Sequence, residues 1–527
     1  MGNGQRVTAR LFAAAAGVMP PPPLQSSLEQ RQQRNNENEN ILDVIIIGNG
    51  PSALALGSLL QRKWVVGTGG ALELSSEALR DAARALAGRD LGDVGGSLLD
   101  SLGRKIPARC VSPTSAVVDG LRFPAADGRG ATLLDADERR PSSGDGAPLA
   151  VAIVGRDPPG GSWHAMPGET LTVSPARWMS LPGLAWSAPP HPSGRATRGA
   201  CAAYYERYAR EVLSAGTCHC GEATAAEVRD GAWRVTVAAA GGERRALRGR
   251  ALVLATGAYD EPRRLRIPGE DRAPLVVHRA PTAPRRRGQR LLVVGAGLSA
   301  ADAVLGWLSG GGTVVHLFRG AAKETRLYAM FGGEHRDAYA GECQLARLVA
   351  GEATNPNYQP VSGRLTAVNE DGTVDLEMAA GGDAGDLRCA KFDVVAILVG
   401  GTPSLGFLAP SLRRRLPPAS LPPGTKLDGT IGTHPVHVRV DTATGLVLAE
   451  DAGGEVLQDA PPLYALGPLR GDNFVRFVVG DAAAVANDLL RRKRKARSLE
   501  TGEHQAEGML AQSQNIQQLG PQKDQPD

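Results

Sequence analysis

Near the start of the chain, an apolar run leads directly into a glycine-rich turn. Residues 41–47 are apolar except for Asp43, and Gly48-x-Gly50-x-x-Ala53 follows them. A continuous apolar run of this length predicts a buried parallel strand. In such a strand–turn–helix, the first glycine permits a tight turn, the second lets a pyrophosphate approach the backbone, and a small third residue lets the helix pack closely on the strand. The pattern therefore predicts a dinucleotide site at a helix N-terminus.

The same arrangement recurs in the middle of the chain. A strand predicted at 290–294 leads into Gly295-x-Gly297-x-x-Ala300, and a helix is expected at 299–308. One such pattern by itself is weak, because many strand–helix turns are rich in glycine. Two patterns, each between a predicted strand and a predicted helix, favour two nucleotide-binding domains.

Arg319 indicates which nucleotide the second pattern binds. It follows a strand predicted at 313–318, where NAD-binding proteins carry a carboxylate for the ribose, whereas an arginine accommodates the extra phosphate of NADP. NADPH is therefore favoured over NADH. The order of the patterns is that of two-domain flavoprotein reductases and monooxygenases, so we expect an α/β fold with two Rossmann-like dinucleotide-binding domains, for FAD and NADPH.

The composition bounds the class of protein. With 42% hydrophobic and 22% charged residues, the chain is typical of globular proteins, and a net charge of +4 gives no reason to expect nucleic-acid binding. No apolar run approaches the roughly 20 residues of a membrane-spanning helix. The six cysteines include no C-x-x-C pair, so we expect no metal site and an intracellular, cytoplasmic location. Residues 1–28 fit either a transit peptide or a disordered tail.

Shifts in composition give the expected organisation. We expect a disordered N-terminal tail at 1–40, a first part of the FAD-binding domain at 41–283 with an insertion at about 63–148, an NADPH-binding domain at 284–400, a return to the FAD-binding domain at 401–492, and a disordered C-terminal tail at 493–527. Other expected elements are helices at 75–87, 200–213 and 482–492, strands at 149–154, 225–237, 246–256, 374–378 and 393–399, an exposed Gly/Asp-rich loop at 127–147, and a Pro/Arg-rich domain joint at 281–287.

Two of these strands end in glycine-rich turns. The strand at 246–256 runs into Thr256-Gly257, and the strand at 393–399 runs into the segment 400–403. Each resembles the crossover by which the chain passes between the two nucleotide domains of such flavoproteins. Thr256 and Gly257 are therefore predicted to border the FAD.

Three further segments resemble one family. Residues 151–168 contain Gly160-Gly161-x-Trp163, which is similar to the Gly-Gly-x-Trp element that passes the flavin in flavin-containing monooxygenases and N-hydroxylases. Together with TLTVSPARWMSLPG at 170–183 and LYALGPLRGDNFVRFVVGDAAAVANDLL at 463–490, this element resembles the oxidative stress-induced growth inhibitor family, a branch of flavin monooxygenase-like proteins.

The resemblance implies an activity and a setting. It implies an FAD-dependent, NADPH-consuming monooxygenase that uses O₂ and an unknown small-molecule or protein substrate. It also implies links to growth control, cell death and cytokinesis, association with the midbody or mitochondria, and cytoskeletal or regulatory protein partners.

The segment near the end supplies the expected flavin neighbours. Asp472 and Asp481 are expected to bind the cofactor, and Asn473 and Arg476 are the candidate catalytic residues. The FAD ribose lacks its usual partner, because the strand before Gly160 ends in Val-Gly-Arg without a carboxylate. Asp157 is either its substitute or a solvated loop residue.

Two alternatives stay open on the sequence alone. The first is an NADPH-dependent reductase that passes electrons to a disulfide or a protein acceptor, which the missing C-x-x-C disfavours. The second is a regulatory protein that keeps a degenerate flavoprotein scaffold and acts through partners, which the altered ribose site and the insertion favour.

Overall fold

Both apolar runs form central strands of parallel sheets in the computed structural model. The structure describes residues 41–68, 74, 76–107, 110–124, 131–141, 147–168, 170–281, 283–284, 286–332, 337–379, 390–416, 438–448 and 460–518, with side chains up to residue 499 except that of Arg326. The tail expected at 1–40 lies outside these residues.

The first sheet runs in the order β7-β4-β1-β10-β9-β8, with β19 also paired to β10. Its strands are β1 (Leu42–Ile47), β4 (Val151–Gly155), β7 (Cys218–Cys220), β8 (Glu222–Arg229), β9 (Ala232–Ala238), β10 (Arg244–Leu254) and β19 (Leu463–Ala465). The β1, β4, β7 and β19 pairings are parallel, whereas β10–β9 and β9–β8 are antiparallel. The first half of β10 therefore belongs to a meander and its second half to the nucleotide-binding sheet.

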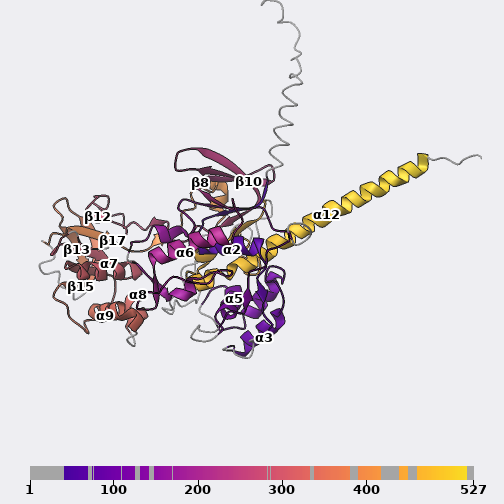
Figure 1. Cartoon of the computed structure of the whole chain (residues 1–527). Helices are drawn as coiled ribbons and strands as arrows, with labels where there is room; N and C mark the ends of the chain where they lie inside the picture. Colours follow the sequence, from indigo (N-terminus) through magenta and orange to yellow (C-terminus); the bar gives the residue numbers. More distant parts are fainter. Residues whose placement is uncertain are drawn as a thin grey trace, which may run out of the picture. The chain divides into compact units, whose positions relative to one another are not determined.

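The second sheet runs in the order β12-β17-β13-β14-β15-β16. Figure 1 labels β12, β13, β15 and β17 of this sheet. Its strands are β12 (Val276–Val277), β13 (Arg290–Val294), β14 (Thr313–Phe318), β15 (Tyr358–Val368), β16 (Val374–Met378) and β17 (Val394–Ile397). All neighbours are parallel except β15 and β16. The predicted strand–helix–strand unit of the second pattern is thus confirmed.

Both faces of each sheet are buried, which explains the continuous apolar runs. In β1, Val44 and Ile46 face one core, and Ile45 and Ile47 face another. The first core is completed by α2 (Pro51–Gln61), α6 (Arg198–Glu211) and the start of α12 (Asp481–Gln518). On the second sheet, α7 (Leu298–Ser309), α8 (Arg326–Phe331) and α9 (Ala340–Val349) contribute to one of the two cores.

The expected insertion is a small helical element. It contains β2 (Val65–Val66), α3 (Glu77–Leu86), α4 (Gly96–Gly103), α5 (Pro113–Arg122) and β3 (Leu134–Asp135). Only the first of its helices was predicted, at 75–87. The loop expected at 127–147 falls partly on residues outside the described ranges.

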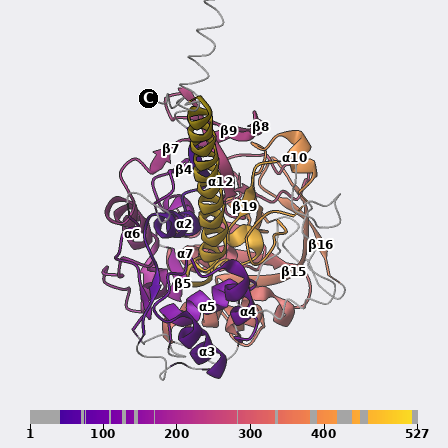
Figure 2. The ribbon, with the colours of Figure 1, turned by 90° about the vertical axis from the view of Figure 1, so that its right-hand side faces the viewer.

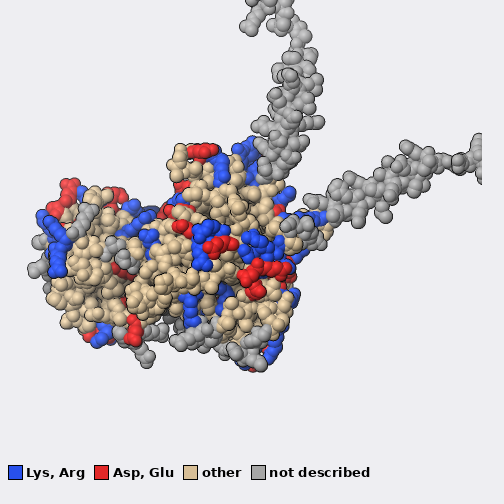
Figure 3. Space-filling model, in the orientation of Figure 1, with Lys and Arg blue, Asp and Glu red and all other residues tan. Residues whose placement is uncertain are grey.

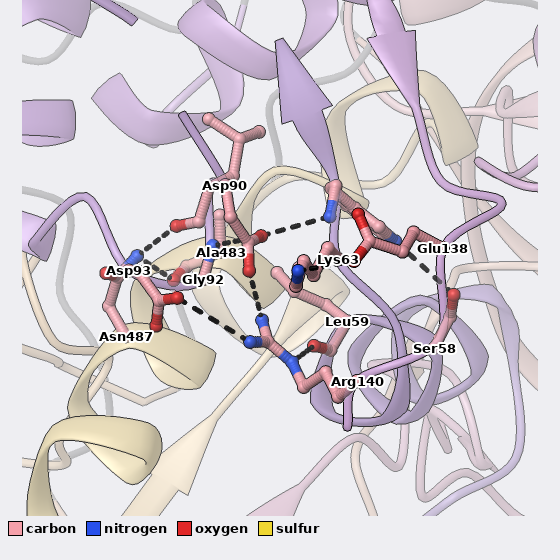
Figure 4. Close-up of polar contacts among 12 residues, drawn as sticks. Ser58, Leu59, Lys63, Asp90, Gly92, Asp93, Glu138, Arg140, Ala483 and Asn487 are labelled. Atoms are coloured by element: carbon pink, nitrogen blue, oxygen red, sulfur yellow. Dashed lines mark hydrogen bonds and ion pairs between the residues drawn. The ribbon is translucent and has the colours of Figure 1, made fainter. Parts of the chain in front are cut away.

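A buried ion pair joins two parts of the insertion, and hydrogen bonds to α2 and α12 fasten the insertion to the rest of the domain (Figure 4). The Arg140 guanidinium lies 2.8 Å from Asp90 Oδ2, and its Nε donates to the Leu59 carbonyl of α2 at 3.1 Å. From α12, Asn487 accepts the Gly95 N–H through Oδ1 at 2.7 Å. The insertion is therefore held by α2 and α12.

One predicted strand proved to be two. The strand expected at 225–237 is interrupted by a turn in which Asp230 and Gly231 have φ of 51° and 69°, so that β8 and β9 form a hairpin. The prediction was wrong because Asp-Gly is a strong hairpin signal that a continuous strand does not accommodate.

The last helix is much longer than predicted. We expected it to end at residue 492 with a disordered tail beyond, but α12 continues to Gln518. Its Ala, Arg, Lys, Glu and Gln residues have high helix propensity, which the compositional argument for disorder overlooked. Lys493 and Arg494 pair with Asp43 and Asp93 at 2.8 and 2.6 Å, so these two cations anchor the helix. Figure 2 shows α12 passing α2, on which it packs.

The two predicted crossovers lie side by side. The short strands β11 (Glu261–Pro262) and β18 (Gly401–Thr402) pair antiparallel. The joint expected at 281–287 comes too late, because β12 has already paired with β17 in the second sheet.

The surface agrees with the modest net charge. On the face in Figure 3, basic and acidic side chains are interspersed. Among the described residues, no helix combines the length and apolar character needed to span a membrane.

The Arg140–Asp90 ion pair yields a stability prediction. Arg140→Met leaves the buried Asp90 carboxylate, whose pKa burial already raises, without its cation, so we expect a loss of about 3–5 kcal/mol of unfolding free energy. The control is Lys63→Met at the more exposed Lys63–Glu138 pair, where a loss of about 0–1 kcal/mol is expected. If the two variants lose the same free energy of unfolding, this role of Arg140 is contradicted.

Candidate dinucleotide sites

Gly48 makes the turn at the end of β1 against the end of β10. Its φ is +104°, and a Cβ at this position would lie 2.1 Å from the Ala255 carbonyl oxygen and 3.0 Å from the Thr256 nitrogen. Conformation and packing both require glycine here. The predicted residues Thr256 and Gly257 are thereby brought next to the first pattern.

Gly295 repeats this contact in the second domain. Its φ is +121°, and a Cβ would lie 2.3 Å from the carbonyl oxygen of Leu398, just after β17. Ala53 and Ala300, the third residues of the two patterns, are fully buried where each helix packs on its sheet. The two domains therefore build their turns by the same close approach.

Gly50 and Gly297 differ from the glycines that precede them. Their φ values are −75° and −98°, and a Cβ on either would meet no atom within 4 Å. They stand at the N-caps of α2 and α7, and no side chain caps either helix. The protein's own packing gives no reason for glycine, whereas a phosphate lying against uncapped N–H groups does. Both turns thus fit a dinucleotide pyrophosphate.

The Gly160-Gly161 loop lies against the first pattern. The Gly160 N–H donates to the Asn49 carbonyl at 2.9 Å, and a Cβ on Gly161 would lie 3.3 Å from Gly50 Cα. Trp163 is half-buried against the first core. The predicted Gly-Gly-x-Trp element therefore borders the turn of the first pattern.

Asn49, which sequence reasoning passed over, connects these loops. Its Nδ2 donates to the Asp157 carbonyl at 2.5 Å. Asp157 is half-buried, while Arg156 is exposed and pairs with Asp260 at 2.9 Å. The signal that could have identified Asn49 is its position between Gly48 and Gly50. A side chain at that position faces the loop after the neighbouring strand β4.

Asp481, a predicted flavin neighbour, lies close to the first pattern. It is fully buried, accepts the Gly467 N–H at 3.2 Å and pairs with Arg470 at 2.8 Å. Gly467 in turn packs on Ser52 in the first turn of α2, where a Cβ would lie 2.4 Å from the Ser52 Oγ.

Asp472 faces the insertion instead. This buried carboxylate accepts the Val111 and Ser112 N–H groups at 2.6 and 3.0 Å, just before α5 begins. Burial, together with the negative charge of Asp481, raises the pKa of Asp472 to about 7. Its described contacts are therefore with the insertion.

Of the two candidate catalytic residues, Arg476 is held by the insertion and Asn473 by its own loop. Arg476 makes two 2.6 Å bonds to Asp119 of α5 and lies 3.9 Å above the Trp178 ring. Asn473 donates through Nδ2 to the Gly471 carbonyl at 3.3 Å, while its buried Oδ1 has no partner within the described ranges. Asn473 thus keeps an acceptor available, and Arg476 is already paired.

Arg319 stands at the end of β14, next to the strand that carries the second pattern. It is exposed and makes no ion pair with the described part of the chain. Its guanidinium is therefore available to an outside anion, as the prediction of NADP requires.

Other chemistries find little support. Within the part of the chain that the structure describes, no group of three or more His, Cys, Asp or Glu side chains could hold a metal ion. The five described cysteines are unpaired, and Cys389 lies outside the described residues.

Comparison with known proteins bears on the family. A sequence profile of the pyridine nucleotide-disulphide oxidoreductase family matches residues 149–330. Oxidative stress-induced growth inhibitor 1 of Mus musculus is 30% identical over 502 residues, which cover 86% of this chain and 96% of the relative. The chain belongs to the oxidative stress-induced growth inhibitor family. The resemblance noted in the sequence is confirmed.

A second family member is more distant. Oxidative stress-induced growth inhibitor 2 of Homo sapiens is 27% identical, with 86% of this chain and 94% of the relative covered. A solved bacillithiol disulfide reductase of Staphylococcus aureus aligns at 15% identity and a TM-score of 0.49, covering 86% of this chain and 99% of that one. The predicted α/β class with two Rossmann-like dinucleotide-binding domains is confirmed by the two sheets, their flanking helices and their glycine turns.

The raised pKa of Asp472 predicts a pH dependence of stability. Between about pH 4, the usual Asp pKa, and about pH 7, the folded chain holds a proton that the unfolded chain releases, so stability falls as pH rises. Asp472→Asn mimics the protonated side chain and should reduce the fall in melting temperature between about pH 5 and about pH 8. Asp81→Asn, at an exposed carboxylate of α3, is the matched control. If the melting temperature of Asp472→Asn falls over this pH range by as much as that of the wild type, the raised pKa of Asp472 is refuted.

Proposed function

We propose that this protein is an FAD- and NADPH-dependent oxidoreductase of the monooxygenase type. The observation that carries the proposal is the pair of bare backbone turns at Gly50 and Gly297. In both, glycine is required neither by φ nor by packing, and an uncapped helix begins there. Backbone N–H groups in this arrangement favour a bound pyrophosphate.

FAD is assigned to the first turn. Gly48, Gly50 and Ala53 form the pyrophosphate site, with the Gly160-Gly161 loop beside it. Five further residues are proposed to border the cofactor or to hold the residues that border it: Trp163, Thr256, Gly257, Asp472 and Asp481. Asp157 is the proposed ribose carboxylate, because Asn49 holds its backbone next to the turn.

NADPH is assigned to the second turn. Gly295, Gly297 and Ala300 form its pyrophosphate site, and Arg319 binds the 2′-phosphate. An exposed arginine without an ion-pair partner in the described part of the chain is suited to bidentate phosphate contact.

When bound, the cofactors supply hydride transfer from NADPH to flavin and the reaction with O₂. The chain's own contribution is to orient the nucleotides and to shield the reaction from water. Asn473 is a candidate hydrogen-bonding group because its Oδ1 is buried without a described partner, and the Arg476–Asp119 pair places a fixed cation near it. We propose these two as the catalytic residues, acting on an unidentified substrate.

A reductase that acts on disulfides is the second candidate. The profile match at 149–330 is to pyridine nucleotide-disulphide oxidoreductases, which favours it. The sequence contains no C-x-x-C, which favours the monooxygenase. Oxygenated product formed from NADPH and O₂ supports the first, and reduction of a disulfide without O₂ uptake supports the second.

The cellular role follows the relatives' name. We extend a part in growth inhibition under oxidative stress to this chain, with cytoplasmic location and links to cytokinesis or cell death through regulatory partners. The unpaired cysteines fit a reducing compartment.

Gly50→Asp and Gly297→Asp test the two sites separately. Aspartate is a favourable N-cap, so each variant should fold. Its charge should repel a phosphate about 4 Å away by about 4 kcal/mol, enough to weaken binding by more than ~100-fold. Gly50→Asp should lose FAD, and Gly297→Asp should keep FAD and lose NADPH, by absorbance and calorimetry. Gly241→Asp, in the exposed turn between β9 and β10, is the control. Retained binding in either test variant would refute that site.

Arg319→Ala tests the choice of nucleotide. Loss of a charge-assisted bond of about 1.5–3 kcal/mol should weaken NADPH ~10- to 100-fold and leave NADH nearly unchanged. The control is Lys391→Ala. Lys391 precedes β17 and therefore lies at the opposite end of the parallel strands from Arg319. Equal loss for both nucleotides would remove the argument for phosphate recognition.

A further inference from the structure

A histidine is buried in the core of the NADPH-side domain, directly beneath its glycine turn. His316 lies in β14 opposite Val293 and is fully buried. Its Nε2 is 2.7 Å from the Gly295 carbonyl oxygen, and its Nδ1 is 2.8 Å from the Tyr358 hydroxyl. Both ring nitrogens therefore have partners.

The partners determine where the ring proton resides. The Gly295 carbonyl can only accept, so Nε2 carries the hydrogen and Nδ1 accepts from the Tyr358 hydroxyl. Burial lowers the pKa of His316 to about 4, so the ring is neutral near pH 7. The chain Tyr358–His316–Gly295 is thus a fixed set of two hydrogen bonds.

This bond constrains the phosphate side of the turn. In a trans peptide the carbonyl of one residue and the N–H of the next point in opposite directions. With the Gly295 carbonyl turned toward His316, the Ala296 N–H is turned away from the core. This N–H has no partner within the described part of the chain. The histidine therefore sets the direction of a free donor in the turn.

The first domain shows that the fold does not require this histidine. There Ile153 of β4 lies opposite Ile46 of β1, as His316 lies opposite Val293. Isoleucine cannot donate a hydrogen bond, and the first turn is held instead through Asn49. A buried polar ring in one domain and an aliphatic residue in its counterpart indicate a role specific to the second site.

We propose that His316 is a positioning residue for NADPH, which fixes the Gly295–Ala296 peptide so that its N–H faces the pyrophosphate. This inference rests on the proposed NADPH site and adds a residue outside the glycine pattern to it. Because the pyrophosphate is common to both nucleotides, His316 acts on NADP⁺ and NAD⁺ alike, whereas Arg319 distinguishes them.

The test uses the full chain loaded with FAD, and NADP⁺ and NAD⁺ as probes in calorimetry. His316→Ile, which installs the residue of the first domain, should weaken both about tenfold, with FAD content unchanged. His316→Gln, whose amide can still donate to Gly295, should recover most of the affinity. Tyr358→Phe, which removes the bond to Nδ1, should weaken both about threefold and serves if His316→Ile fails to fold.

The outcomes separate the two claims. A wild-type chain that binds neither nucleotide would overturn the proposed function and this inference with it. If the wild-type chain binds both nucleotides and His316→Ile binds them with the same affinity, only the role of His316 is overturned. The same holds for Tyr358→Phe if that variant alone folds. A loss confined to NADP⁺ would also overturn it, because the effect would then lie at the 2′-phosphate.

Discussion

The contact on which both nucleotide-binding domains depend is the approach of a glycine to a backbone carbonyl at the end of a neighbouring strand. Gly48 meets the Ala255 carbonyl and Gly295 meets the Leu398 carbonyl, each so closely that no side chain fits. This contact fixes where the next helix begins. Folding alone therefore leaves Gly50 and Gly297 bare at two helix N-termini, so the two proposed pyrophosphate sites are preformed.

The insertion is part of the first domain rather than an appendage. Asp472 accepts a backbone N–H just before α5, and Asp119 of α5 pairs with Arg476. Arg140 of the insertion donates to the Leu59 carbonyl of α2. The segment expected to border the flavin is consequently built from two regions distant in sequence. The insertion thereby holds both Asp472 and Arg476 of this segment.

Much of the fold could be predicted from the sequence, since strands buried on both faces appear as unbroken apolar runs. The strands at 290–294 and 313–318 were predicted with their observed ends. The β8–β9 hairpin was missed although Asp230-Gly231 carried the signal for its turn, and the length of α12 was missed because composition says little about a charged helix. Of the site, the glycines, Arg319 and the Gly160 loop were predictable from local rules. The Asp119–Arg476 pair, 357 residues apart, was not, because no local pattern relates its members.

The central claim is that one chain binds both nucleotides and passes electrons between them. Its most direct test is an anaerobic titration of the purified, FAD-loaded chain with NADPH, followed by flavin absorbance. The account predicts that the protein retains FAD and that the flavin spectrum bleaches on addition of NADPH. A chain that retains no FAD, or a bound flavin that stays oxidised in excess NADPH, would contradict it.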